Sequence, residues 1–321
     1  MSLAVLFSSQ GSQSIGMGRD LAVAWPSAAA CFTEADAALG WSVSTTCWYG
    51  PEEGLNDTRQ TQPCLFTTSL ACLRALEEAC NRRGERLAPA VVAGHSVGEY
   101  AALVSAGVLT FHDALQLVAL RGRLMADADL DGGMTAVIGL ERETVADAVA
   151  MTGIGGDLVL ANDNAPRQVV ISGSTAALER VSTALVPAGA RRTIALRVSG
   201  PFHSPMMEPV GERLAAAFEE VTWHDADPPM VSNVTAESVR DGSRIRSLLA
   251  RQVSSPVEWV RAVRRMVADG VDMFIECGPG GALTGMVRRI APGARTLNVS
   301  DEASLEATVS ALLAAPVGAT A

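Results

Sequence analysis

The chain of 321 residues contains no lysine, and all 25 of its basic residues are arginine. Without lysine the protein cannot use a Ser–Lys dyad, a Schiff base or the lysine of a phosphate-binding P-loop. Histidine is scarce as well: four residues, at 95, 112, 203 and 224, are the only imidazole bases. The net charge of −10 argues against nucleic acid as the main partner.

The sequence also lacks a long apolar run. No stretch approaches the length of a membrane span, and the start, MSLAVLFSSQGSQ, has no basic region or cleavage site of a signal peptide. The six cysteines form no C-x-x-C pair, and the spacing of Cys64, Cys72 and Cys80 indicates one helix face. We therefore expect reduced, buried thiols in a soluble, cytoplasmic protein that does not bind membranes.

Strands alternate with helices at both ends of the chain. The short apolar runs typical of buried strands cover residues 3–7, 89–94, 271–276 and 296–299, and helical patterns follow them, with a closing helix over about 301–314. This alternation predicts a parallel sheet with helices on both faces.

The middle of the chain has another order. A strand (134–140), a helix (141–151), two strands (157–163 and 167–173), a helix (175–189) and a strand (191–198) follow one another. The order βαββαβ is typical of a ferredoxin-like unit. We expect 131–199 to be a subdomain inserted through the flexible DGG sequence at its start, and 1–130 with 200–321 to form the larger, discontinuous one.

A serine stands at a sharp corner in PAVVAGHSVGEYAAL (89–103). A G-x-S-x-G sequence between a strand and a helix is the context of a nucleophile elbow. The glycines allow a cramped backbone, and the helix N-terminus places partial positive charge beside the oxygen of Ser96. Alternatively, Ser96 caps its helix and Glu99 completes a capping box. The strand–turn–helix context favours the nucleophile.

The base for this serine is found by elimination. His95 adjoins Ser96, but consecutive side chains at an elbow point apart, so we expect a structural role. His112 and His224 fall in a first helical turn and in a polar loop, where histidines are commonly solvated. His203 follows a predicted strand, in a loop stiffened by prolines, PFHSPMM. No aspartate stands in a comparable turn, so we expect a Ser–His dyad whose imidazole is oriented by a backbone carbonyl.

The helix predicted over 111–128 carries an arginine within its apolar arc. At 100° per residue, Arg121 falls near the middle of the arc formed by Ala114, Leu117, Val118, Leu120, Leu124 and Met125. Arg123 falls on the opposite side, where a solvated arginine belongs. A buried guanidinium needs an anionic partner. Two partners are open: a structural carboxylate of the chain, or a carboxylate of the substrate.

Eight motifs follow in order: QGSQSIGMGRDL (10–21), TRQTQPCLF (58–66), GHSVGEYAALVSAG (94–107), LRGRLM (120–125), NAPRQVVISG (164–173), PFHSPMM (201–207), SSPVEW (254–259) and ECGPGGALTGMVRR (276–289). With these motifs the chain resembles the malonyl-CoA:acyl carrier protein transacylases over nearly its whole length. The resemblance implies an α/β fold, with an α/β-hydrolase-like large subdomain and an inserted ferredoxin-like one.

The resemblance also implies a ping-pong reaction. Ser96 attacks the thioester of malonyl-CoA with His203 as base, and the malonyl group then passes to the phosphopantetheine thiol of an acyl carrier protein. The CoA thioester is a substrate, and no metal or bound cofactor is implied. The pathway would be fatty-acid or polyketide biosynthesis.

Further roles come from matching positions in the family. Arg121 matches the arginine that pairs with the malonyl carboxylate, which favours the substrate as its partner. Gln10 and Val97 match the residues whose backbone N–H groups form the oxyanion hole, and Gln252 matches the residue whose backbone carbonyl holds the histidine. Phe202 resembles the malonyl-selective members.

One motif departs from the family. It reads FSSQGSQ, where many relatives have Pro-Gly before QGSQ. Ser8 and Ser9 change the loop that carries Gln10, but a backbone donor tolerates side-chain changes, so we expect the oxyanion hole to survive.

The acidic total charge requires a local basic patch for an acidic carrier protein. Arg288 and Arg289, or the arginines at 261, 264 and 265, are candidates, and a solvated helix face is the equal alternative. With no exposed amphipathic helix that demands a partner, we expect a monomer.

Three other functions use the same residues. The chain could be the malonyl-loading subunit of a malonate decarboxylase, which differs in its carrier. It could be a serine esterase or thioesterase, although such an enzyme gains nothing from a buried Arg121. It could be a non-catalytic interaction subunit, although such a subunit needs no base.

Overall fold

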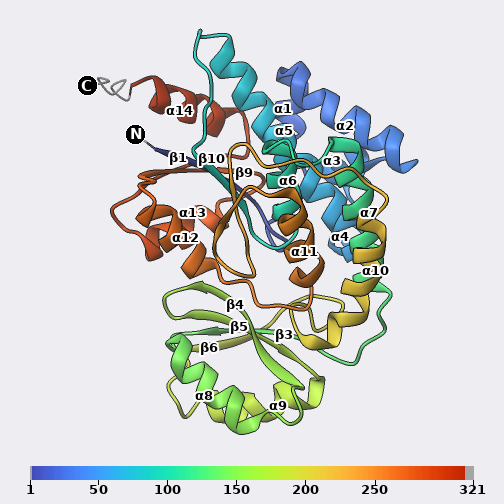
Figure 1. The fold of residues 1–321 in the computed structure, drawn as a ribbon, viewed down its shortest axis with the longest axis vertical. Helices are drawn as coiled ribbons and strands as arrows, with labels where there is room; N and C mark the ends of the chain where they lie inside the picture. Colours follow the sequence, from blue (N-terminus) through green and yellow to red (C-terminus); the bar gives the residue numbers. More distant parts are fainter. Residues whose placement is uncertain (1, 315–321) are drawn as a thin grey trace.

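The computed structural model describes residues 2–314, in which two β-sheets form two subdomains (Figure 1). The larger sheet has the strand order β10-β9-β1-β2-β7-β8. Its strands are β1 (Leu3–Phe7), β2 (Val91–Gly94), β7 (Met230–Val231), β8 (Ser238–Val239), β9 (Met273–Cys277) and β10 (Arg295–Val299). Neighbouring strands are parallel except for β8, which is antiparallel to β7. The sequence analysis did not predict β7 and β8, because two residues carry no periodicity.

The helices of the larger subdomain surround this sheet. They are α1 (Arg19–Ala24), α2 (Pro26–Leu39), α3 (Val43–Tyr49), α4 (Glu52–Asn56), α5 (Thr58–Asn81), α6 (Gly98–Ser105), α7 (Phe111–Ala126), α10 (Glu208–Phe218), α11 (Gly242–Gln252), α12 (Trp259–Ala268), α13 (Ala282–Ile290), α14 (Glu302–Leu313) and a short 3₁₀ helix (Pro205–Met207). Within the described residues, no helix is long and apolar enough to cross a membrane.

Both faces of the large sheet are buried, as predicted. In β1 the side chains of Leu3, Val5 and Phe7 belong to the apolar cluster that contains the buried residues of α2, α5 and α7. Ala4 and Leu6, which alternate with them, belong to the cluster that contains α12 and α13. This alternation follows from the two-residue period of a strand, and it explains why the buried strands read as continuous apolar runs.

The smaller sheet has the element order β3, α8, β4, β5, α9, β6 and the antiparallel strand order β4-β5-β3-β6. Its elements are β3 (Gly133–Ile138), α8 (Arg142–Thr152), β4 (Leu158–Ala165), β5 (Gln168–Gly173), α9 (Thr175–Leu185) and β6 (Arg192–Ala195). This is the predicted βαββαβ unit, with α8 and α9 on the sheet's outer side (Figure 1). All of these elements lie between residues 131 and 199, and the exact subdomain boundaries remain a prediction.

The two subdomains are joined near residue 257. The backbone N–H of Val257 donates to the carbonyl of Ala161, 2.8 Å away, and the N–H of Asp163 donates to the carbonyl of Val257 at 3.0 Å. Arg142 of α8 adds ion pairs with Asp163 of β4 at 3.0 Å and with Glu258 at 2.8 Å. Strand β4 therefore lies directly against the segment that leads into α12.

The cysteines are buried and free, as predicted. Cys64, Cys72 and Cys80 all lie on α5, at the eight-residue spacing that suggested one helix. Burial raises the pKa of the Cys31 thiol to about 12, so it is unreactive near neutral pH.

Candidate active site

The corner at Ser96 joins β2 to α6, and its glycines are required by close backbone contacts. A Cβ on Gly94 would lie 1.9 Å from the carbonyl carbon of Gly98, and a Cβ on Gly98 would lie 2.3 Å from the carbonyl oxygen of Phe7. Ser96 itself has a φ of 53°, a left-handed conformation that is uncommon for a residue other than glycine. The sequence G-x-S-x-G thus permits a strained turn that presents the serine side chain at the carboxyl edge of the sheet.

The predicted base lies against this serine. Nε2 of His203 is 2.8 Å from Oγ of Ser96. Nδ1 of His203 lies 2.9 Å from the carbonyl oxygen of Gln252 and 3.1 Å from that of Ser255. Because both of these groups only accept hydrogen bonds, Nδ1 carries the proton and the lone pair of Nε2 faces the serine hydroxyl. The structure brings together the predicted dyad and the carbonyl of Gln252 that the family resemblance implied.

His203 is buried, and its own charge is disfavoured. Burial and then the nearby guanidinium of Arg121 lower the pKa of His203 to about 3. The imidazole is therefore neutral near pH 7, the form that accepts a proton from the serine.

Arg121 points at Ser96 from α7. Its Nη2 donates to Oγ of Ser96 at 3.1 Å, and its side chain is 1% exposed. The next residue, Gly122, permits this placement, because a Cβ there would lie 2.7 Å from the carbonyl oxygen of Thr58 at the start of α5. Helix α7 can therefore approach α5 closely. Arg123 is exposed, as predicted.

The other partners of Arg121 are uncharged amides. Nη1 donates to Oε1 of Gln62 at 2.7 Å, and Nη2 donates to Oε1 of Gln252 at 3.0 Å. The Nε–H is buried and has no acceptor among residues 2–314. Burial lowers the pKa of Arg121, although an arginine remains charged near neutral pH. A full positive charge is thus held beside the serine without a carboxylate bonded to it, which leaves the structural ion pair considered from the sequence unsupported.

Two buried residues, Asn233 and Glu99, support the corner through contacts that the sequence did not indicate. Asn233, between β7 and β8, accepts a hydrogen bond from the backbone N–H of Ser96 and donates one to the carbonyl of Gly94, both at 2.7 Å. Glu99 accepts the backbone N–H of Asn233 at 2.7 Å and also accepts from Nε2 of Gln252. Burial raises the pKa of Glu99 to about 7. No sequence pattern marks these contacts, because Asn233 lies 137 residues from Ser96.

The capping-box alternative is wrong. Helix α6 has no side-chain cap, because Oγ of Ser96 lies on His203 and the carboxylate of Glu99 lies on Asn233 and Gln252. The serine oxygen is engaged by a base and a cation instead of by the backbone of its own helix.

The loop after β1 lies at the same edge of the sheet, since Phe7 pairs with Gly94 in the parallel register. The backbone N–H groups of Gln10 and Val97 donate to no acceptor within the part of the chain that the structure describes. Ser8 is buried and its Oγ donates to the carboxylate of Glu276 at 3.3 Å. Ser8, one of the two serines that depart from the family motif, therefore has a hydrogen-bond partner within the fold.

The remaining histidines take no part in this site. His95 is buried, and its Nε2 lies 2.8 Å from Oδ1 of Asn164 on β4, away from Oγ of Ser96. His112 and His224 are exposed. These positions agree with the roles predicted from the sequence.

The candidate basic patch is partly neutralised. Arg261 pairs with Glu258 at 3.8 Å and Arg265 with Asp269 at 2.7 Å. Arg288 and Arg289 are exposed at the end of α13. Among the residues that the structure describes they bond only to uncharged oxygens, with Arg289 on the β4–β5 turn.

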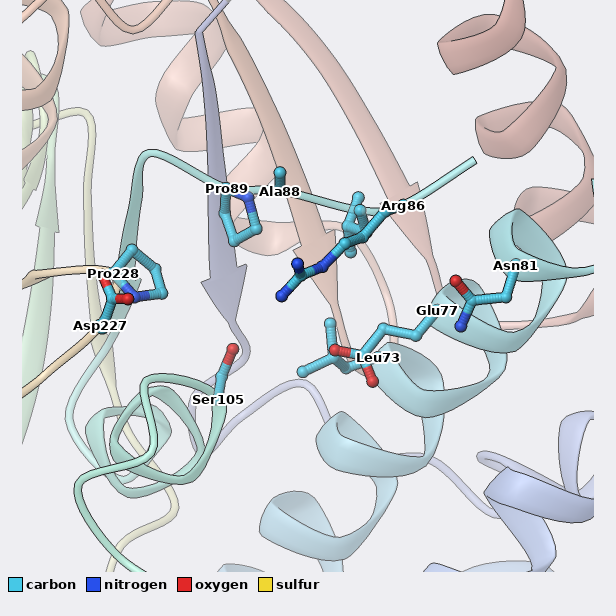
Figure 2. A pocket seen from close by; sticks show the side chains of 10 residues that line it. Leu73, Glu77, Asn81, Arg86, Ala88, Pro89, Ser105, Asp227 and Pro228 are labelled. Atoms are coloured by element: carbon cyan, nitrogen blue, oxygen red, sulfur yellow. The ribbon is translucent and has the colours of Figure 1, made fainter. Parts of the chain in front are cut away.

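A hollow of about 520 Å³ lies elsewhere in the molecule (Figure 2). It is lined by Leu73, Glu77, Asn81, Arg86, Leu87, Ala88, Pro89, Ser105, Asp227 and Pro228. Pro89 precedes β2 and Ser105 ends α6, whereas Ser96 lies between these elements. The hollow is therefore at the opposite end of β2 from the dyad and contains none of its residues.

A model of the acyl transferase domain family matches residues 5–306. The chain belongs to this family. A malonyl CoA-acyl carrier protein transacylase of Haemophilus influenzae is 41% identical over 306 residues, which cover 95% of this chain and 97% of that protein. Among solved members, an acyl carrier protein S-malonyltransferase from Vibrio cholerae has a TM-score of 0.90 and 40% identity, with 96% of this chain and 100% of that chain covered.

A second solved structure holds a type II polyketide synthase acyl carrier protein in complex with its malonyl-transacylase. It has a TM-score of 0.91 and 39% identity to this chain, and the match covers 97% of this chain and 100% of that one. The acyl transferase family and the two-subdomain α/β fold expected from the motifs are confirmed.

Proposed function

We propose that this acyl transferase moves a malonyl group from malonyl-CoA to the phosphopantetheine thiol of an acyl carrier protein. The observation that carries the proposal is Arg121, a buried cation that bonds to Oγ of Ser96 and otherwise to two neutral amides. Such a cation is stabilised by an anion that arrives with the substrate. The distal carboxylate of a malonyl group, once the acyl group is on Ser96, supplies that anion.

In the first half-reaction, Oγ of Ser96 attacks the thioester carbonyl carbon while its proton moves to Nε2 of His203. The backbone N–H groups of Gln10 and Val97 donate to the oxyanion that forms. As the tetrahedral intermediate collapses, the carbon–sulfur bond breaks and the CoA sulfur takes the proton from His203. The product is a malonyl ester of Ser96.

In the second half-reaction, the carrier thiol gives its proton to His203 and its sulfur attacks the ester carbonyl. The bond to Oγ breaks, and the serine recovers the proton. Nucleophile, base and cation are all side chains of this chain, so we propose that the reaction uses no resident metal or cofactor. The carrier complex of a relative supports an acyl carrier protein as acceptor.

Relatives named as transacylases favour transfer over the esterase and malonate decarboxylase alternatives. We place the reaction in fatty-acid or polyketide biosynthesis, which use the same chemistry. The arginines at 288 and 289 are our candidates for contact with an acidic carrier. A monomeric state and a cytoplasmic location remain predictions.

The direct test is intact-mass measurement after brief mixing with malonyl-CoA. We expect a single malonyl adduct on the wild type, no adduct on Ser96→Ala, and loss of the adduct when a holo carrier protein is added. Ser105→Ala, at the far end of the helix that follows Ser96, is the matched control and should be acylated like the wild type. Steady release of free malonate without an acceptor would instead establish a hydrolase.

A further inference from the structure

Glu99 is a buried acid that the proposed reaction does not use. It is 2% exposed and lies in the first turn of α6, three residues after the nucleophile. Both of its oxygens accept hydrogen bonds from groups that hold the site, namely the backbone N–H of Asn233 and Nε2 of Gln252. Burying a carboxyl group is costly, and the hydrogen bonds that offset this cost for Glu99 all come from groups at the site.

The contact with Gln252 determines which way that amide faces. A side-chain amide has one accepting and one donating end. The donating end of Gln252 lies on Glu99 and, at 2.8 Å, on the carbonyl oxygen of Ser96. The accepting end is thereby left for Nη2 of Arg121, at 3.0 Å. Two acceptors at the donating end, the ionised carboxylate of Glu99 and the carbonyl oxygen of Ser96, disfavour the opposite orientation of the amide.

The orientation matters because Arg121 has no carboxylate bonded to it. If the amide were reversed, its NH₂ group would face the guanidinium, and two donors would oppose each other at hydrogen-bond distance. The guanidinium would lose one of its three acceptors and move from Oγ of Ser96. The carboxylate of Glu99 thus acts on Arg121 through one intervening amide, which leaves the guanidinium free of a direct ion pair.

We propose that Glu99 is a positioning residue for acyl selection: through the amide of Gln252 it holds Arg121 beside Ser96, ready for the carboxylate of the acyl group. The inference rests on the proposed malonyl transfer. It predicts an effect that depends on the charge of the acyl group, because acetyl and malonyl groups share the dyad and oxyanion donors but only malonyl uses Arg121.

The test compares acylation rates of Glu99→Gln with malonyl-CoA and acetyl-CoA. The substitution keeps the size of the side chain but leaves one accepting oxygen in place of two, so the donors of Asn233 and Gln252 can no longer both be satisfied. We expect the malonyl-to-acetyl rate ratio to fall by at least about tenfold, the range for a lost hydrogen bond to a charged group. This ratio does not depend on the fraction of folded enzyme, so partial unfolding cannot imitate the result.

The matched control is Glu276→Gln. Glu276 is also fully buried, and in the described part of the chain it accepts only from Ser8 and from the backbone N–H groups of Leu283 and Thr284. Its loss should lower the melting temperature and leave the ratio unchanged. An equal fall of the ratio in both variants, or an unchanged ratio in Glu99→Gln, would overturn the inference.

A second variant covers the case in which Glu99→Gln does not fold. Gln252→Met removes the amide but keeps the backbone carbonyl that holds His203. We expect the same fall in the ratio, and no further fall when both substitutions are combined, because the two residues act along one path. An unchanged ratio in Gln252→Met would overturn the inference. Failure of malonyl transfer itself appears separately, as absence of the adduct in the wild type.

Discussion

Arg142 and Arg121 differ in the groups that surround their positive charges: Arg142 has carboxylate partners, whereas Arg121 bonds to neutral groups. Arg142, at the start of α8, pairs with the carboxylates of Asp163 and Glu258, and these partners raise its pKa. Arg121, on α7, is 1% exposed, and burial lowers its pKa; within residues 2–314 its hydrogen-bond acceptors are all neutral.

We interpret the difference as that between a structural cation and the cation that we propose binds the substrate. Arg142 receives its anions from the chain and joins the two subdomains across β4 and the start of α12. Arg121 sits next to the nucleophile with its Nε–H unsatisfied among the described residues. Over the described range, the fold supplies two carboxylates to Arg142 and none as a hydrogen-bond partner to Arg121. We propose that the carboxylate of the substrate takes that place at Arg121.

The greatest loss of activity should come from replacing His203, and this loss sets the scale for the effects of replacing the two arginines. His203→Ala removes the base that serves every acyl group, so acylation by malonyl-CoA and acetyl-CoA should slow together by about 10²–10⁴-fold, the usual contribution of a general base. Single-turnover rates of Ser96 acylation measure both. A loss confined to malonyl-CoA would mean that His203 contacts the acyl carboxylate instead of the serine.

Arg142→Met should affect stability and leave acyl choice alone. It strips two carboxylates that are 9% and 7% exposed of their shared partner. Because the Arg142 side chain is 34% exposed, we expect about 1–3 kcal/mol of destabilisation, less than for a fully buried pair. Denaturant unfolding gives the free energy, and the malonyl-to-acetyl ratio is the control. A changed ratio with unchanged stability would reverse the roles assigned to the two arginines.

The rate of acylation should depend only weakly on pH. With a pKa of about 3, His203 stays neutral, so acylation by acetyl-CoA should change little between pH 8 and pH 5. An imidazole with an ordinary pKa would lose about 30-fold at pH 5. Acetyl-CoA is the substrate here because its acyl group carries no carboxylate for Arg121 to bind.

The pH dependence of acylation by acetyl-CoA should also distinguish Arg121 from Arg142. A nearby cation disfavours the imidazolium, so removing the guanidinium raises the pKa of His203. In Arg121→Met the acidic limb should therefore move to higher pH, whereas in Arg142→Met it should stay in place. A wild-type limb centred near pH 6.5 would contradict the assigned environment of His203.

The sequence contained the local part of this site. Two glycines flanked Ser96 where a Cβ would meet backbone, and Arg121 interrupted an apolar arc that the structure buries. His203 followed from the scarcity of histidine. Each of these signals lies in the residue itself or in its helix or turn.

The groups that hold the site were missed because their contacts are distant along the chain. Asn233 and Gln252 lie 137 and 156 residues from Ser96, and no periodicity records such a pair. The family resemblance supplied the backbone carbonyl of Gln252 but not its side-chain amide. The strands β7 and β8 were missed for a related reason, since two residues form a strand only through their neighbours in the sheet.

In the proposed function, Arg121 is kept without a carboxylate partner so that it can bind the acyl carboxylate. The most direct test is single-turnover acylation of the wild type and Arg121→Met by malonyl-CoA and by acetyl-CoA. We predict a loss on the order of 10²–10³-fold for malonyl, as for truncation of a buried charge pair, and little change for acetyl. Equal losses for both acyl groups would contradict the claim and make Arg121 a structural residue.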